Sequence, residues 1–158
     1  TMANRNVFSV EGNEALLAAS AGRATAFEAA TSILETGAAA AAAAEATTLP
    51  EAFCTVCSHL NIAPHPQLPA ACVGTEISCR GWRYDLGSLT ALLLVLPKFT
   101  GVGRLRFWHC ALSEAAIQLL ATTLHRTPVR LLAIDLNPPP GCAPCGSGLD
   151  LATGAALE

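Results

Sequence analysis

The feature that most constrains the fold of this chain is a repeat in its second half. Three pairs of residues match at an offset of 28 positions: Ile77 and Leu105, Cys79 and Phe107, Tyr84 and Leu112. Three further pairs match at an offset of 29 positions: Val102 and Leu131, Leu105 and Ile134, Phe107 and Leu136. Repeats of 20–29 residues each form one supersecondary unit, and neighbouring units stack to bury a common core.

Each repeat begins with residues that alternate between apolar and polar, which predicts a short strand, and continues with a helical apolar stripe. The expected strands are 76–80, 104–108 and 132–136, and the expected helices are 86–96 and 114–124. Asp85 and Ser113 are N-cap residues for the two helices, and Pro97 and Pro128 end them. Leu86, Leu89, Leu93 and Leu96 form the stripe of the first helix. The pattern predicts an α/β fold, a right-handed βα solenoid segment.

The motif Leu105-x-Phe107-x-x-Cys110-x-Leu112 resembles the ribonuclease-inhibitor-like leucine-rich repeats, and the resemblance covers residues 73–137. A narrower resemblance, over 76–82, 105–108 and 131–137, is to the family of the ciliary leucine-rich-repeat-containing protein numbered seventy-one in the vertebrate series. That family implies a non-enzymatic scaffold of the ciliary or flagellar axoneme, in the central apparatus or an associated complex. Its implied partners are other axonemal proteins in a large hetero-complex, and its implied location is the cytoplasm and cytoskeleton.

The N-terminal third has a different composition. Residues 1–50 hold 17 of the 31 alanines, and a helix is expected over 14–35 with only Gly22 interrupting it. Because alanine buries little apolar area, residues 1–48 are expected to form an Ala-rich arm or a partner-stabilised helix. Three further regions are expected. Residues 49–72 form a short helix (51–60) and a Pro-rich connector, and residues 73–137 form the repeats. Residues 138–158 form a Pro/Gly/Cys loop and the start of a further element.

Charge and hydropathy exclude several classes of function. The net charge of -3 does not fit a nucleic-acid-binding domain, which needs basic side chains for phosphates. The apolar runs, such as 38–44 and 91–96, are far shorter than the ~20 residues of a membrane span. No secretory signal is evident at the N-terminus, so we expect a cytoplasmic protein without membrane or nucleic-acid partners.

Two cysteine pairs, Cys54/Cys57 and Cys142/Cys145, have the spacing of zinc ligands. They lie far apart in the sequence, and the first pair has the apolar surroundings of a helix, so we expect no metal and no other cofactor. Cys79 and Cys110 replace apolar repeat positions and are expected to be buried, reduced thiols. No glycine-rich phosphate loop or Gly-x-Ser-x-Gly motif occurs, so neither enzymatic activity nor a small-molecule substrate is expected. The alternative is a zinc-binding or signalling-adaptor leucine-rich-repeat regulator in the cytosol.

The candidate binding residues alternate away from the predicted core. Five of them are proposed to contact a protein partner: Arg80, Arg104, Arg106, Trp108 and Asp135. A tryptophan flanked by arginines is typical of an interaction hot spot, because Trp, Tyr and Arg are enriched there. Trp82 and Tyr84, in the turn after the first strand, are expected to pack inside it.

Overall fold

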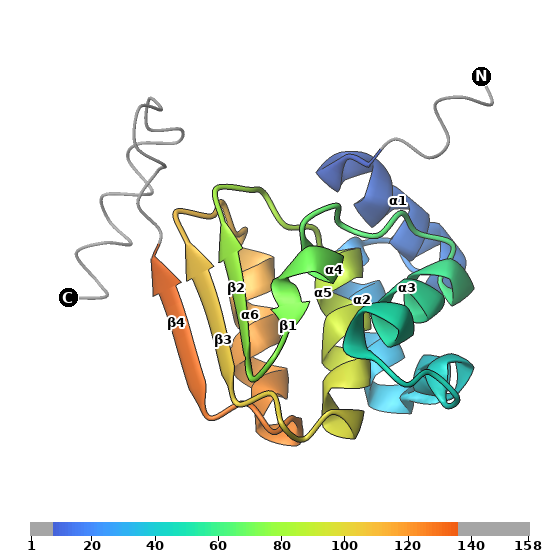
Figure 1. Cartoon of the computed structure of the whole chain (residues 1–158). Helices are drawn as coiled ribbons and strands as arrows, with labels where there is room; N and C mark the ends of the chain where they lie inside the picture. Colours follow the sequence, from blue (N-terminus) through green and yellow to red (C-terminus); the bar gives the residue numbers. More distant parts are fainter. Residues whose placement is uncertain (1–7, 136–158) are drawn as a thin grey trace.

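Three parallel strands and one short antiparallel strand form the sheet in the computed structural model, which describes residues 8–135 (Figure 1). The strands are β1 (Cys72–Val73), β2 (Glu76–Arg80), β3 (Arg104–Trp108) and β4 (Leu131–Asp135), in spatial order β1-β2-β3-β4. The α-helices are α1 (Val10–Ala21), α2 (Ala26–Thr36), α3 (Leu49–His59), α4 (Leu68–Ala71), α5 (Leu86–Val95) and α6 (Glu114–Thr123). Short 3-10 helices are η2 (Ala38–Ala43), η3 (Leu96–Lys98) and η4 (Leu124–Arg126). The expected α/β class is therefore confirmed.

The pairing of β2 with β3 confirms the first repeat offset. These strands are parallel, and Ile77 pairs with Leu105 while Cys79 pairs with Phe107. A parallel bridge between Arg83 and Ala111 carries the same offset into the following turn. Parallel neighbours need a crossover connection, and α5 supplies it here.

The second repeat offset is wrong by two residues. Phe107 pairs with Ile134, so β3 and β4 are offset by 27 residues, and β4 starts at Leu131 rather than at position 132. The backbone fixes this start, because the N–H groups of Arg130 and Leu131 both donate to the Gly103 carbonyl, at 2.8 and 3.1 Å. Since side chains alternate with a period of two, the shift leaves the expected faces of Ala133, Ile134 and Asp135 unchanged. Leu131 differs: the repeat offset matches it with the buried Val102, but it pairs with Arg104 and is 40% exposed.

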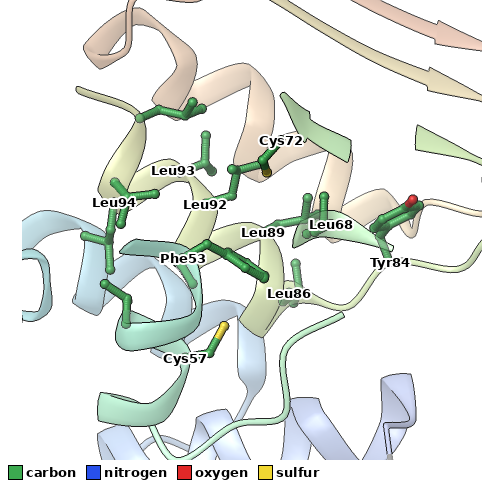
Figure 2. Close-up of a cluster of buried hydrophobic side chains, with 14 of the residues drawn as sticks. Phe53, Cys57, Leu68, Cys72, Tyr84, Leu86, Leu89, Leu92, Leu93 and Leu94 are labelled. Carbon is green, nitrogen blue, oxygen red and sulfur yellow. The ribbon is translucent and has the colours of Figure 1, made fainter. Parts of the chain in front are cut away.

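Helix α5 is buried on every side. The sequence predicted burial of only one side, the stripe of four leucines. All ten of its residues are buried, including Ala91, Leu92 and Leu94 outside the stripe. The sheet lies on one side of α5, and α1, α2 and α3 contact it on others (Figure 1). Figure 2 shows α5 leucines packed around Phe53 of α3 and toward Tyr84. A helix that is apolar all round must be covered all round, and the N-terminal helices provide that cover.

The helix expected over 14–35 is two helices in the structure. Gly22, in the left-handed conformation with φ 65°, ends α1, and Thr25 begins α2 through a capping box with Glu28. Both helices contact α5, and Ala29 and Ala30 are fully buried. The surface that stabilises the Ala-rich region therefore belongs to this same chain. No helix within residues 8–135 is long and apolar enough to cross a bilayer.

Lys98 anchors the alanine run to the rest of the core. Its Nζ donates to the carbonyls of Ala43, Ala44 and Ala46, at 3.1, 2.7 and 2.6 Å. These carbonyls lie at and just after the end of η2, where a cation is favoured. One ammonium group thus holds a segment whose own side chains bury little area.

We expect Lys98→Met to lower the free energy of unfolding by about 1–2 kcal/mol, because three charge-assisted hydrogen bonds at a partly exposed site are lost. Urea denaturation followed by circular dichroism measures the change. Arg23→Met, at an exposed arginine on the loop between α1 and α2, is the matched control and should stay within about 0.5 kcal/mol of the parent. Equal stability of the parent and the Lys98 variant would contradict the anchoring role.

Candidate functional site

The three parallel strands separate two sets of side chains. Ile77, Cys79, Leu105 and Phe107 are buried toward α5 and α6. The opposite side of the sheet, called the strand face below, consists of Glu76, Ser78, Arg80, Arg104, Arg106, Trp108, Leu131, Ala133 and Asp135. Every residue of the strand face is partly or fully exposed in the described chain. Helices α5 and α6 lie on the other side of the sheet (Figure 1).

Trp108 lies between two guanidinium groups on this face. The Cζ atoms of Arg80 and Arg106 lie 5.9 and 5.6 Å from the centre of the Trp108 ring, within cation–π range. Arg106 Nε also lies 2.8 Å from Glu76 Oε2, an ion pair that is not an aligned hydrogen bond. These contacts hold the Trp108 ring on the surface of the sheet, where it is partly exposed and does not belong to the buried core.

The structure brings three of the five predicted binding residues into contact, places Asp135 beside them on the next strand and sets Arg104 apart. Arg80, Arg106 and Trp108 form the cluster just described. Asp135 pairs with Trp108 across β3 and β4, and its Oδ2 lies 3.6 Å from Nδ1 of His109. Arg104 is exposed at the opposite end of β3. Glu76 was not predicted to be a site residue, although its register opposite Arg104 places it one diagonal step from Arg106.

Trp82 does not pack inside the turn as expected. Gly81, with φ 68°, turns the chain at the end of β2, and Trp82 is 42% exposed with its ring edge against His65. Tyr84 is buried as expected and stacks on His65, with ring centroids 4.1 Å apart. The buried His65 ring thus takes the interior place, and Trp82 covers it from outside.

His65 is a structural residue with a neutral ring. Its Nε2 donates to the Arg83 carbonyl at 2.8 Å, and its Nδ1 accepts from the Gln67 N–H at 3.0 Å. This tautomer follows from the partners, since the Gln67 N–H can only donate. Burial lowers the pKa of His65 to about 4, so the ring carries no charge near neutral pH. Both nitrogens are used by the backbone, which leaves no proton-transfer role for the ring.

The expected burial of Cys79 and Cys110 is confirmed. Their exposed fractions are 1% and 3%, and the Cys110 thiol donates to the Cys79 carbonyl at 3.3 Å. Burial raises the pKa of Cys79 to about 12, so the reactive thiolate is scarce. Cys54 and Cys57 lie on α3, the first exposed and the second buried. Cys142 and Cys145 lie outside the described residues, and residues 8–135 contain no group of three His, Cys, Asp or Glu able to hold a metal.

We expect a bulky maleimide to label Cys54 rapidly in the native protein and to label Cys79 and Cys110 only after unfolding. Mass spectrometry of proteolytic peptides reads each thiol separately. Cys54 is the internal control for reagent activity. Fast native labelling of Cys79 or Cys110 would contradict their place in the core.

Comparison with known proteins adds no relative: no family model, no curated protein and no solved structure matches this chain. The strand face, with the cluster of Arg80, Arg106 and Trp108 at the C-terminal ends of β2 and β3, is the candidate site on its own geometry.

Proposed function

We propose that this chain is a non-enzymatic protein-interaction module that binds a partner through the strand face. The observation that carries the proposal is Trp108, held partly exposed between Arg80 and Arg106 on the side of the sheet away from α5 and α6. Tryptophan and arginine are the residue types most enriched among binding hot spots. Exposed apolar surface of this kind is stabilised when a partner covers it.

Within this proposal, residues 73–137 are a segment of a right-handed leucine-rich-repeat solenoid. The parallel pairing of β2, β3 and β4 and the recurring strand–helix order support it. Repeats of this type stack on one another, so the partly exposed Leu132 and Ile134 of β4 suit contact with a further repeat or another protein.

The cellular role that we propose is that of a scaffold component in the ciliary or flagellar axoneme, bound to other axonemal proteins in a hetero-complex. Its support is the resemblance of residues 76–82, 105–108 and 131–137 to the ciliary leucine-rich-repeat family. The arrangement of Arg80, Arg106 and Trp108 is consistent with a role in assembly.

We expect Trp108→Ala to remove co-purification of axonemal proteins with the tagged full chain expressed in ciliated cells. Truncating a central interface tryptophan costs about 2 kcal/mol or more, which is roughly thirtyfold in affinity. Quantitative mass spectrometry of the purified material is the measurement, and Gln118→Ala, at an exposed position of α6, is the control. Unchanged recovery of the same proteins with Trp108→Ala would contradict the proposed function.

A further inference from the structure

A shallow hollow of about 410 Å³ lies at the edge of the sheet where β3 and β4 begin. Six residues line it: Thr75, Gly101, Gly103, Arg104, Arg130 and Leu131. The edge is at the bottom of Figure 1, at the opposite end of β3 from Trp108. Arg104 and Leu131 belong to the strand face, so the hollow continues that face.

Two glycines line the hollow, and backbone hydrogen bonds fix its rim. A Cβ atom built on Gly101 or Gly103 meets no atom within 4 Å. The Gly103 N–H donates to the Thr75 carbonyl at 3.0 Å, and the Gly103 carbonyl accepts from Arg130 and Leu131. The two arginines of the hollow therefore extend from a backbone whose position is set.

The hollow lies in the basic part of an acidic chain. Residues 76–135 contain seven basic side chains against four acidic ones, while residues 8–75 contain one basic side chain against six acidic ones. Arg104 and Arg130 are both exposed, and no carboxylate of residues 8–135 lies within ion-pair distance of either. Leu131, which is 40% exposed, adds an apolar wall beside them. Two guanidinium groups beside a small apolar surface suit the carboxylate and methylene groups of an acidic side chain.

Resting on the function proposed above, we propose that this hollow binds an acidic side chain of an extended partner segment that runs along the strand face to Trp108. Arg104 and Trp108 are four residues apart on β3, which is roughly 13 Å at the ~3.3 Å rise of a strand. In an extended segment, residues four positions apart point to the same side. The partner segment thus carries Asp or Glu at one position and a large apolar residue four positions away.

The test uses the full chain and a fluorescent nine-residue peptide with two adjacent glutamates at one end, the nearer placed four positions from a leucine. The matched peptide has glutamine in place of both glutamates. We expect fluorescence anisotropy at low salt to show about tenfold weaker binding of the glutamine peptide. Raising the salt from about 0.05 to 0.3 M should weaken only the glutamate peptide, because screening acts on its charges.

Variants of the chain test the hollow directly. Arg104→Gln combined with Arg130→Gln should weaken the glutamate peptide about tenfold and leave the glutamine peptide unchanged. Gly101→Leu keeps both charges but fills the hollow, and it should weaken the glutamate peptide as well. Arg23→Gln removes an arginine that donates to Ser32 on α2 and should bind like the parent chain.

Equal binding of the two peptides, or parent-like binding by the double arginine variant, would overturn the inference. If Trp108→Ala weakens both peptides while the double arginine variant binds both like the parent chain, the hollow is not used and the proposed function stands. If no variant changes binding, the inference and the proposed function both fail. Salt-sensitive dimers of the chain in sedimentation, abolished by the double arginine variant, would overturn the acidic segment in favour of a second copy.

Discussion

Phe107→Ala should lower the free energy of unfolding by about 3–5 kcal/mol, the range observed for large-to-small changes at buried aromatic positions. Phe107 on β3 is 0% exposed, and its ring packs edge-on to Tyr84 with centroids 5.4 Å apart. The loss combines the transfer of the ring to water with the cavity that remains between the sheet and the helices. A domain with a stability of 5–15 kcal/mol would be close to unfolding at physiological temperature.

Thermal and urea denaturation followed by circular dichroism measure this loss. Trp108→Ala is a matched control, because Trp108 is the next residue of the same strand and points to the opposite face. It should cost less than about 1 kcal/mol, since only cation–π contacts at a partly exposed site are lost. A parent-like Phe107→Ala, or a Trp108→Ala as unstable as Phe107→Ala, would contradict the register of β3.

Asn13→Leu should lower the free energy of unfolding by about 2–4 kcal/mol at pH 7, although the two side chains have the same number of heavy atoms. Asn13 is 1% exposed, and it links α1 to the connector and to the N-cap of α5. Its Nδ2 donates to the Ala63 carbonyl at 2.9 Å and to Asp85 Oδ2, and its Oδ1 accepts from the Ala63 N–H at 2.7 Å. Leucine would leave the buried Asp85 carboxylate and the Ala63 backbone without these partners.

The Asn13→Leu deficit should shrink as the pH falls from 7 toward 4. Burial raises the pKa of Asp85, and the hydrogen bond from Asn13 opposes this rise. Without Asn13 the pKa of Asp85 in the folded state rises further above its unfolded value of about 3.9. The folded variant then binds more protons than the unfolded chain in this window, so acidification stabilises it relative to the parent. Urea denaturation across this pH range is the measurement, and Ser20→Leu, at an exposed position of α1, is the control. A deficit that is absent, or that grows on acidification, would contradict this account.

The strand and helix of each repeat were predictable because they rest on local periodicity. Both N-caps, Asp85 and Ser113, accept the hydrogen bonds expected of them, from Ser88 and Ala116. The second offset was wrong because Leu132, Ile134 and Leu136 are all apolar, so the pattern fits a slip of two residues equally well. The register is decided by the backbone pairing of β3 with β4, which begins where the Arg130 and Leu131 N–H groups donate to Gly103.

The packing of α1 could not be read from periodicity, because its apolar residues do not gather on one face. The contacts that place α1 include polar ones distant in sequence, such as Asn13 to Asp85 and the Leu86 N–H to Glu14 at 3.1 Å. One signal did exist in the sequence. The uninterrupted apolar run 91–96 indicates a helix that needs cover on every side.

The candidate site was predictable as a face but not as a set of contacts. Alternation along 104–108 placed Arg104, Arg106 and Trp108 on one side, and the structure agrees. The pairing of Trp108 with Arg80 depends on the register between β2 and β3, which is a non-local property. The separation of Arg104 from this cluster follows from the length of the strand.

Hydroxyl-radical footprinting of the full chain, free and in the complex purified from ciliated cells, tests most directly whether the strand face binds the partner. The chain has two tryptophans, so Trp82, 42% exposed and outside the strand face, is a control of identical chemistry. We expect oxidation of Trp108 to fall in the complex while oxidation of Trp82 stays at its free level. Unchanged oxidation of Trp108 on assembly, with protection at Trp82 or on the helices instead, would contradict the central claim.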